Sequence, residues 1–257
     1  MDLLEHRDKK STTRHPWETA RFELMLKLLY KDHILSSSNN IADIGCGDTY
    51  IVNSLSNLFP EKIYIAIDSA FSLEDIEYFN SKTKSHNISL LRNIENIKPE
   101  QNIDLILLMD VIEHIEFEED FLRLLLTNDF INNNTKFLIT VPAFNSLFSD
   151  HDKHLKHYRR YNLKELKKVT KSAGLEIQSS GYFFTSLLFI RVVQKINESF
   201  YGSKEQKGLN KTEYNKKTAL IVKTFLLLDF GITNLLNKIG LKIPGLSTYV
   251  ICKKSAQ

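Results

Sequence analysis

The chain has 257 residues and a net charge of +3, and its 42% hydrophobic and 25% charged residues are typical of a globular protein with one full core and an appendage. The charged first residues lack the apolar segment of a signal peptide, and no apolar run reaches the roughly 18 residues that span a bilayer. Only Cys46 and Cys252 are present, which argues against a disulfide framework and predicts reduced thiols in a cytoplasmic protein.

The charge is unevenly distributed along the chain. Residues 1–150 hold 14 Lys and Arg against 24 Asp and Glu, whereas residues 151–257 hold 20 against 7. A basic C-terminal half indicates an anionic partner such as phosphate, nucleic acid or a lipid surface, or else a solvated basic surface.

Alternating helical and extended patterns follow a polar N-terminal segment that we expect to be flexible. Apolar residues recur at helical spacing from Pro16 to about His33, and Pro16 suits a first helical position. Ser72 and Asp75 have the spacing of a capping box. In chain order the pattern then predicts strand 41–45, helix 50–58, strand 63–67, helix 73–83, strand 88–91, strand 103–110, helix 117–127 and strand 136–141.

The run IDLILLMD at 103–110 is almost continuously apolar, which is typical of a strand buried on both faces of a parallel sheet. A basic amphipathic helix at 162–173 ends at Gly174 and precedes a strand at 175–180. Two apolar helical segments around a polar loop then form a helical hairpin before the last strand, 247–252.

This alternation predicts an α/β fold: a Rossmann-like, doubly wound, mostly parallel seven-stranded sheet with the hairpin inserted before the last strand. The chain is accordingly divided into four segments: a flexible N-terminus (1–14), a core with an N-terminal helical lid (15–181), the inserted helices (182–243) and a last strand that completes the core (244–257).

The segment IADIGCGDTY at 41–50 joins a strand to a helix through a glycine turn. Gly45 and Gly47 let a ligand approach the backbone, and the next strand ends in Asp68, 21 residues after Gly47. A strand-end carboxylate in this position holds the hydroxyl groups of a ribose. The layout predicts a nucleoside ligand.

Two kinds of nucleoside site compete for this turn. A dinucleotide site requires G-x-G-x-x-G, but its third glycine would fall at Tyr50, which would crowd a pyrophosphate. The pattern D-x-G-x-G, beginning at Asp43, resembles motif I of the class I S-adenosylmethionine (SAM)-dependent methyltransferases. It departs from that family at Thr49, where many members have a third glycine, so we expect a slightly altered turn.

The resemblance implies SAM as the cofactor. The cofactor-binding residues that it assigns around the turn and the second strand are Asp43, Gly45, Cys46, Gly47, Asp68 and Ser69.

Two further segments extend the resemblance. DVIEHI at 110–115 is similar to the D-V-x-E-H segment after the fourth strand of small-molecule methyltransferases, which implies that Asp110 and Val111 line the donor site, with Glu113 and His114 nearby. Alternatively, Glu113 and His114 only begin a helix. In LLRNIENI at 90–97, the resemblance implies that Asn93 contacts the adenine and Ile94 packs on its ring, although the more frequent aspartate is absent.

The most distinctive segment, VPAFNSLFSDHDKHLKHYRRYN at 141–162, resembles a V-P-A loop signature, ending in H-x-R-R-Y, of a bacterial branch of these enzymes. Ligands of open α/β sheets bind beyond the carboxyl ends of the strands, so this loop overhangs the methyl group. His151 or His154 is expected to be the catalytic base that takes a proton from a hydroxyl.

The other polar residues of this loop are assigned to the acceptor. Arg159 and Arg160 either clamp a phosphate or carboxylate or pin the loop through pairs with protein carboxylates. The pattern H-D-x-H-x-x-H could ligate zinc or iron, but no cysteine joins it and the family generally needs no metal, so no metal site is predicted. The remaining residues expected to contact the acceptor are His114, His157 and Tyr158.

The segment HPWETAR at 15–21 is similar to an H-x-W-x-x-x-R helix of the same branch. Trp17 and Arg21 lie four residues apart on one helical face and are expected to form a lid over donor and acceptor. Alternatively, Trp17 is a core anchor.

The resemblance therefore implies a SAM-dependent methyltransferase that acts on a small-molecule or lipid- or glycan-linked acceptor, at oxygen, with a histidine base. The alternatives are a nucleotide-dependent oxidoreductase and a non-catalytic SAM- or RNA-binding protein, but the chain has no aromatic RNA-binding signature and no N-P-P amino-methylation motif. The inserted helices are expected to contact the acceptor, a second copy in a homodimer, or a membrane surface. We expect a cytoplasmic protein with peripheral membrane association and no nucleic-acid partner.

Overall fold

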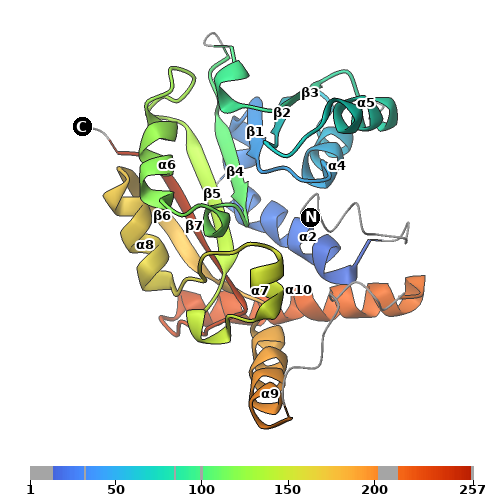
Figure 1. Cartoon of the computed structure of the whole chain (residues 1–257), viewed down its shortest axis with the longest axis vertical. Coiled ribbons are helices and arrows are strands. Elements are labelled where there is room, and N and C mark those ends of the chain that lie inside the picture. The colour runs from blue at the N-terminus through green and yellow to red at the C-terminus, as the bar shows by residue number, and fades with distance from the viewer. Residues whose placement is uncertain (1–13, 32, 84, 99–100, 202–213, 256–257) are drawn as a thin grey trace.

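A single seven-stranded sheet forms the centre of the computed structural model, which describes residues 14–31, 33–83, 85–98, 101–201 and 214–255. The strand order is β3-β2-β1-β4-β5-β7-β6, and β7 is antiparallel to both of its neighbours (Figure 1). The predicted mostly parallel seven-stranded sheet is confirmed. The strands are β1 (Asn40–Ile44), β2 (Ile63–Ile67), β3 (Ile88–Leu91), β4 (Leu105–Met109), β5 (Lys136–Pro142), β6 (Leu175–Phe183) and β7 (Ser247–Lys254).

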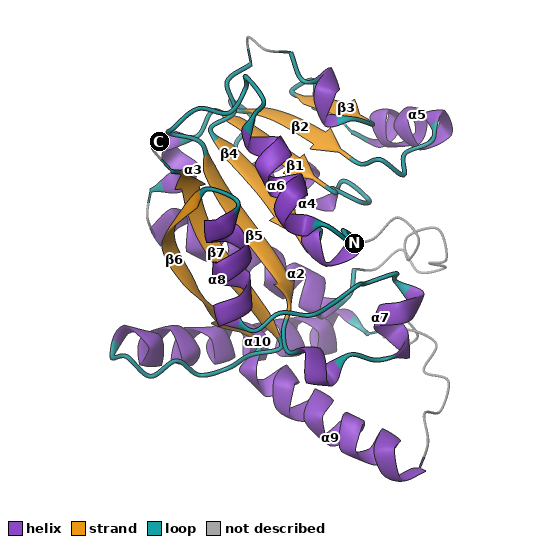
Figure 2. Ribbon diagram, turned by 60° about the vertical axis from the view of Figure 1, so that its left-hand side comes forward, coloured by secondary structure: helices purple, strands orange, loops and turns teal. Residues whose placement is uncertain are grey.

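Helices cover both faces of this sheet (Figure 2). Alternate residues of β4 explain the two layers: Leu105 and Leu107 pack in a core with α2, α4 and α10, whereas Ile106 and Leu108 pack in a second core with α6 and α8. The helices are α2 (Pro16–Lys31), α3 (Ile34–Ser37), α4 (Tyr50–Leu58), α5 (Leu73–Lys82), α6 (Glu118–Leu126), α7 (Asp150–His154), α8 (Leu163–Ser172), α9 (Thr185–Tyr201) and α10 (Lys216–Lys238).

Most predicted elements are present with small shifts at their ends. The capping box of α5 is confirmed: the Asp75 amide donates to the Ser72 hydroxyl at 3.1 Å, and the Ser72 amide donates to the Asp75 carboxylate at 2.8 Å. The helix predicted from Pro16 to about His33 ends at Lys31, and His33 adopts a left-handed φ of 54° before the separate short helix α3 begins. β6 continues to Phe183, beyond its predicted end at 180, because β7 pairs with it as far as Ser247.

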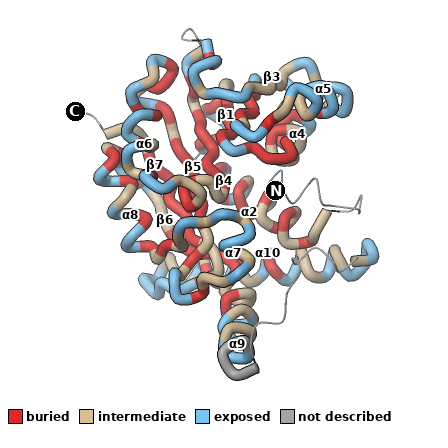
Figure 3. Tube along the Cα trace, in the orientation of Figure 1, coloured by how far each residue is buried: buried red, intermediate tan, exposed pale blue. Residues whose placement is uncertain are grey.

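The two inserted helices contact the rest of the protein differently. α10 lies along α2, where Leu226 and Phe230 are buried and Lys223 pairs with Glu23. The start of α9 meets α10, since the Ser186 amide donates to the Asp229 carboxylate at 3.1 Å. Beyond this contact α9 projects away from the sheet (Figure 1). Much of both helices is exposed, in contrast to the buried strands (Figure 3).

The expectation that no segment is apolar enough to span a bilayer needs a correction. Among the described residues, one helix is long and apolar enough to cross a membrane by length and composition alone. It is the 22-residue stretch Lys216–Asn237 of α10, which has a mean hydropathy of 1.7 and is 17% buried. Polar residues such as Lys223, Thr224 and Asp229 interrupt the apolar runs of this helix. No single run is therefore long enough to span a bilayer, although the mean hydropathy of the whole helix is high. The predicted N-terminal segment, apart from Arg14, lies outside the described residues.

Two glycines provide a matched test of this packing. A Cβ on Gly245, just before β7, would lie 2.2 Å from the carbonyl oxygen of Phe183, whereas a Cβ on Gly231 in α10 would meet nothing within 4 Å. We expect Gly245→Ala to lower the free energy of unfolding by roughly 1–3 kcal/mol, because backbone must move. Gly231→Ala should raise it by about 0.5–1 kcal/mol, since alanine favours a helix interior. Urea unfolding followed by circular dichroism measures both, and equal midpoints for the two variants would contradict the packing described here.

Candidate functional site

The candidate site lies at the carboxyl ends of β1, β2, β4 and β5, which are parallel neighbours and end at the same edge of the sheet. The first component is the turn after β1. Gly45 and Gly47 have φ angles of 73° and 55°, and Thr49 has a φ of 60°. Thr49 therefore adopts the left-handed conformation that its glycine counterpart in the family would take without strain.

The turn packs directly on the segment after β4. A Cβ added to Gly45 would lie 2.6 Å from Cγ2 of Val111, closer than such atoms approach. A glycine is therefore required at position 45, and Val111 packs against the turn. Its role as a donor-lining residue stays a prediction. Cys46 beside it is buried, and burial raises the pKa of its thiol well above the ordinary value, so it packs as an uncharged residue.

Asp68 at the end of β2 is oriented by backbone amides. Its Oδ2 accepts a hydrogen bond from the Gly47 amide at 2.9 Å, and its Oδ1 accepts one from the Ala70 amide at 2.9 Å. Each carboxylate oxygen can accept a further bond, which the hydroxyls of a ribose would supply. Ser69 next to it is exposed.

The end of β3 lies beside Asp68, whose amide donates to the carbonyl of Leu91 at 3.1 Å. Asn93 follows β3, is exposed and precedes a short 3-10 helix, Ile94–Asn96, while Ile94 is half-buried. Both residues thus lie near the carboxylate expected to hold the ribose, but no contact assigns either one to an adenine.

Asp43 provides the test of whether the site fits the cofactor. Its side chain is fully buried in β1, and neither carboxylate oxygen has a hydrogen-bond partner among the described residues. Burial raises its pKa to about 7. A buried carboxylate without a partner suits a cationic ligand, and SAM carries an ammonium and a sulfonium group. The turn, Asp43 and Asp68 therefore fit SAM.

Arg21 connects α2 to the strand ends. Its Nη1 lies 2.5 Å from Oδ2 of Asp110, and its Nη2 donates to the Thr140 hydroxyl at 2.7 Å. Asp110 itself has a left-handed φ of 58°. Trp17, one turn earlier, is half-buried, and the Arg21 guanidinium lies 5.8 Å from its ring centroid. Arg21 is thus paired to protein groups at the strand ends, whereas Trp17 packs against the hydrophobic core on the α2 side of the sheet, in agreement with the core-anchor alternative. The lid over donor and acceptor stays a prediction.

A buried carboxylate, Asp152, organises the loop after β5. It accepts hydrogen bonds from the Ser149 amide at 2.8 Å and from the Arg160 Nε at 2.7 Å, and its Oδ1 lies 2.9 Å from Nδ1 of His157. Burial alone would raise its pKa, but the hydrogen bonds from His157 and Arg160 keep the pKa below the ordinary value. The sequence did not indicate this role for Asp152, although the S-x-x-D spacing of Ser149 and Asp152 is a capping-box signal.

Both arginines predicted to bind the acceptor are bound to protein carboxylates. Arg160 makes a two-point contact with Asp152, and Arg159 pairs with Glu118 and donates to the Glu116 carbonyl at 2.6 Å. The alternative of a pinned loop describes both, because each guanidinium is already engaged. Tyr158 is exposed, and its backbone amide donates to the carbonyl of Glu113 at 2.8 Å, which joins the loop to the segment after β4.

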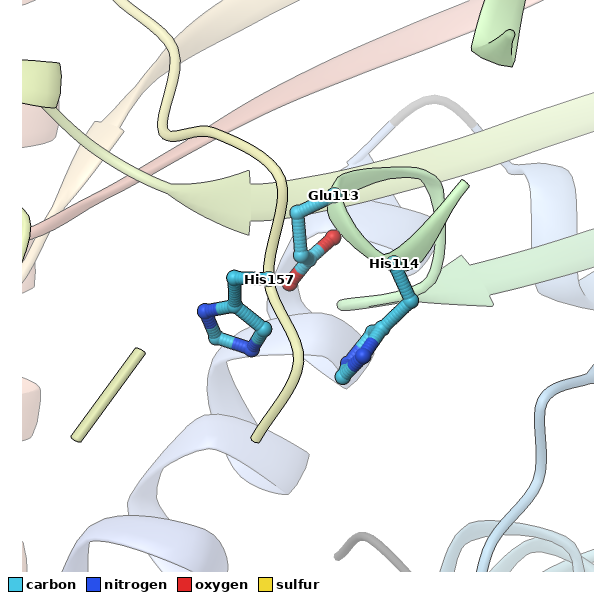
Figure 4. Close-up of side chains that lie close together, drawn as sticks. All are labelled: Glu113, His114 and His157. Carbon is cyan, nitrogen blue, oxygen red and sulfur yellow. The ribbon is translucent and has the colours of Figure 1, made fainter. Parts of the chain in front are cut away.

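Glu113, His114 and His157 form a cluster at this junction (Figure 4). The two imidazole rings meet edge to face, with centroids 4.5 Å apart. Glu113 is fully buried, and neither of its carboxylate oxygens has a hydrogen-bond partner among the described residues. Burial, followed by the nearby charge of Asp110, raises its pKa well above the ordinary value. We call these three side chains the Glu-His-His cluster.

The two histidines predicted as bases lie on the short helix α7 in different surroundings. His151 is half-buried, and burial lowers its pKa below the ordinary value of 6.5 despite the opposing charge of Asp152. His154 is exposed to solvent. A neutral imidazole close to Asp152 and His157 is therefore available at His151.

Comparisons with known proteins agree with this geometry. A family model described as a methyltransferase domain matches residues 17–180. The chain therefore belongs to this family of class I methyltransferases, and its cofactor is S-adenosylmethionine. No curated protein matches the chain.

Solved structures share the fold. A SAM-dependent methyltransferase from Archaeoglobus fulgidus is 18% identical, with 91% of this chain and 94% of that chain covered and a TM-score of 0.51. The methyltransferase domain of bacterial CtHen1-C is 12% identical, with 93% and 99% covered and a TM-score of 0.53. At these identities the similarity extends to the fold alone.

Removing the Asp68 carboxylate should weaken SAM binding at least about tenfold. The variant loses both the oxygens that would accept hydrogen bonds from the ribose hydroxyls and the hydrogen bond that orients Gly47. Isothermal titration of Asp68→Ala with SAM and with S-adenosylhomocysteine measures this. Glu61→Ala is the matched control, since that carboxylate precedes the opposite end of β2 and is 65% exposed. Unchanged affinity in a folded Asp68→Ala protein would remove Asp68 from the site.

Proposed function

We propose that this methyltransferase methylates a hydroxyl oxygen of a small-molecule or lipid-linked acceptor, with a histidine as the base. The observation that carries the proposal is the set of imidazoles at the strand ends next to the glycine turn. Val111 packs on Gly45, and Glu113 and His114 of the Glu-His-His cluster come shortly after it in the chain. The loop that carries α7 joins this segment through the hydrogen bond from the Tyr158 amide to the Glu113 carbonyl. The segment after β4, DVIEHI, also lacks the N-P-P motif of amino-methylating enzymes.

SAM, when bound, supplies a methyl group attached to a sulfonium leaving group. The acceptor oxygen forms the new C–O bond while the C–S bond breaks and leaves its electron pair on sulfur. The hydroxyl proton passes to a neutral imidazole, and the products are a methyl ether, S-adenosylhomocysteine and an imidazolium that returns its proton to water. The residues of this chain hold the donor at Asp43 and Asp68 and exclude water at the strand ends.

Between the two predicted bases, the surroundings favour His151. Its half-burial keeps the ring neutral near pH 7, whereas the exposed ring of His154 has no such constraint. His151 also lies close enough to Asp152, His157 and Arg160 for their charges to act on it. We therefore assign proton removal to His151.

If His151 is the base, turnover requires its neutral form. Burial lowers the pKa of His151 below 6.5, so the imidazole stays neutral down to that pH. As the pH is lowered, the rate should therefore stay constant to below pH 6.5 and then fall. His151→Ala should lower kcat by roughly a hundredfold or more, remove this acid limb and leave SAM affinity intact. His154→Ala, on the same helix, should have the smaller effect. Loss of SAM binding in His151→Ala would instead make the residue structural.

We further propose that the exposed apolar surface of α9 and α10 contacts an anionic membrane surface, which would bring a lipid-linked acceptor to the site. Exposed lysines, Lys216, Lys217 and Lys242, lie at the ends of α10, and residues 151–257 are strongly basic. Two copies would face each other with like charge, whereas anionic lipid attracts both the apolar and the basic groups. The apolar side chains are Phe189, Ile190, Val193, Ile196, Leu220, Ile221, Phe225, Leu228, Ile232 and Leu235.

Vesicle sedimentation tests this surface. We expect binding to vesicles that contain phosphatidylglycerol, weaker binding to phosphatidylcholine alone, and a loss of about tenfold in Ile221→Gln/Phe225→Gln. Leu124→Gln is the control, since that leucine is also exposed but lies on α6. A dimer in solution that the double variant abolishes, without lipid binding, would assign the surface to a second copy. Resistance to alkaline extraction from membranes would instead indicate that α10 spans them.

A further inference from the structure

We propose that the Glu-His-His cluster binds one divalent transition-metal cation, such as Zn²⁺ or Mn²⁺. The candidate ligand atoms of Glu113, His114 and His157 lie within 4.8 Å of one another, and the side chains converge on one space (Figure 4). Around an ion with bonds of about 2.0–2.2 Å, neighbouring ligands lie roughly 3–3.5 Å apart. Side-chain movements of about 1–2 Å would therefore close the site around an ion.

The carboxylate of Glu113 points to a cationic ligand. It is fully buried, and neither oxygen has a hydrogen-bond partner among the described residues. Arg21 and Arg160 lie close enough for their charges to act on it, but they bind Asp110 and Asp152. A buried carboxyl group without such a partner ionises only where a cation pairs with it or a metal is coordinated.

His157 has the orientation of a metal ligand. Its Nδ1 lies 2.9 Å from Oδ1 of Asp152, which leaves Nε2 for the cluster. A carboxylate on the far ring nitrogen is the usual companion of a metal-bound histidine, because it sets the tautomer and the ring direction. Asp152 is itself held by Ser149 and by the two-point contact of Arg160, so this histidine is fixed before any ion arrives.

The ligand set also indicates the kind of ion. Two imidazoles and one carboxylate suit Zn²⁺, Mn²⁺ or Fe²⁺, whereas Mg²⁺ and Ca²⁺ prefer oxygen ligands. No metal site is expected from the sequence, where the candidate ligands of the H-D-x-H-x-x-H pattern all lie on one loop. The cluster instead takes Glu113 and His114 from the segment after β4 and only His157 from the loop after β5.

A role for the ion rests on the proposed function. An ion beside the methyl donor would bind the acceptor hydroxyl, lower its pKa and hold its oxygen toward the methyl group, with the proton leaving to His151. The ion-binding site itself does not depend on which acceptor is methylated.

The test uses the full-length protein after dialysis against a chelator. Equilibrium dialysis with ZnCl₂, MnCl₂ and MgCl₂, followed by elemental analysis, should give one Zn²⁺ or Mn²⁺ per chain and a weaker response to Mg²⁺. Glu113→Gln and His114→Gln should each weaken binding at least about tenfold, and Asp152→Asn by roughly 10–100-fold. His86→Ala is the matched control, because it removes an exposed histidine that is not part of the cluster. This variant should bind the ion as the wild type does.

A folded wild-type protein that takes up none of these ions would overturn the proposal, as would equal binding by the wild type and both cluster variants. Circular dichroism and SAM titration on the same samples establish that each variant is folded. SAM binding without ion binding would reject the metal and leave the methyltransferase assignment intact. Ion binding in a protein that methylates no hydroxyl acceptor would retain the metal site and reject the proposed oxygen acceptor.

Discussion

The close approach between the turn after β1 and the segment after β4 is the constraint on which the rest of the site depends. β1 and β4 are hydrogen-bonded neighbours, and both end at the same edge of the sheet. The approach of Val111 to Gly45 leaves no room for a side chain at position 45. This contact places the glycine turn and the Glu-His-His cluster next to each other, because Val111 precedes Glu113 and His114 by only a few residues.

Buried carboxylates at these strand ends divide into two kinds. Asp152 is surrounded by donors from Ser149, His157 and Arg160, so it holds the loop in place and its charge is already balanced. Asp43 and Glu113 are equally buried but have no hydrogen-bond partner among the described residues. A paired buried carboxylate stabilises structure, whereas an unpaired one is costly unless a ligand brings positive charge. By this distinction Asp152 is a structural residue, whereas Asp43 and Glu113 are candidates for binding a positively charged ligand.

The inserted helices differ from the core in how much of their apolar surface is buried. Leu226 and Phe230 anchor α10 to α2, but most of the apolar side chains that the structure describes on α9 and α10 face solvent. An apolar and basic surface of this kind is unusual on a monomeric soluble protein unless it has a partner. The insertion of α9 and α10 between β6 and β7 leaves the sheet intact, since β7 pairs along both β5 and β6.

The sequence by itself determined the sheet and the glycine turn, because apolar runs and glycine spacing are local properties of the chain, and the resemblance of its motifs indicated the methyltransferase family. It could not decide which polar residues of the loop after β5 would meet. Arg159 is bound to Glu118, Arg160 is bound to Asp152, and His157 meets Glu113 and His114 from another strand end. The apolar average of α10 was also missed, because interrupted runs hide it. Only the tertiary structure settled these pairings, since contacts between residues distant in sequence depend on how the sheet edge and the loops fold over one another.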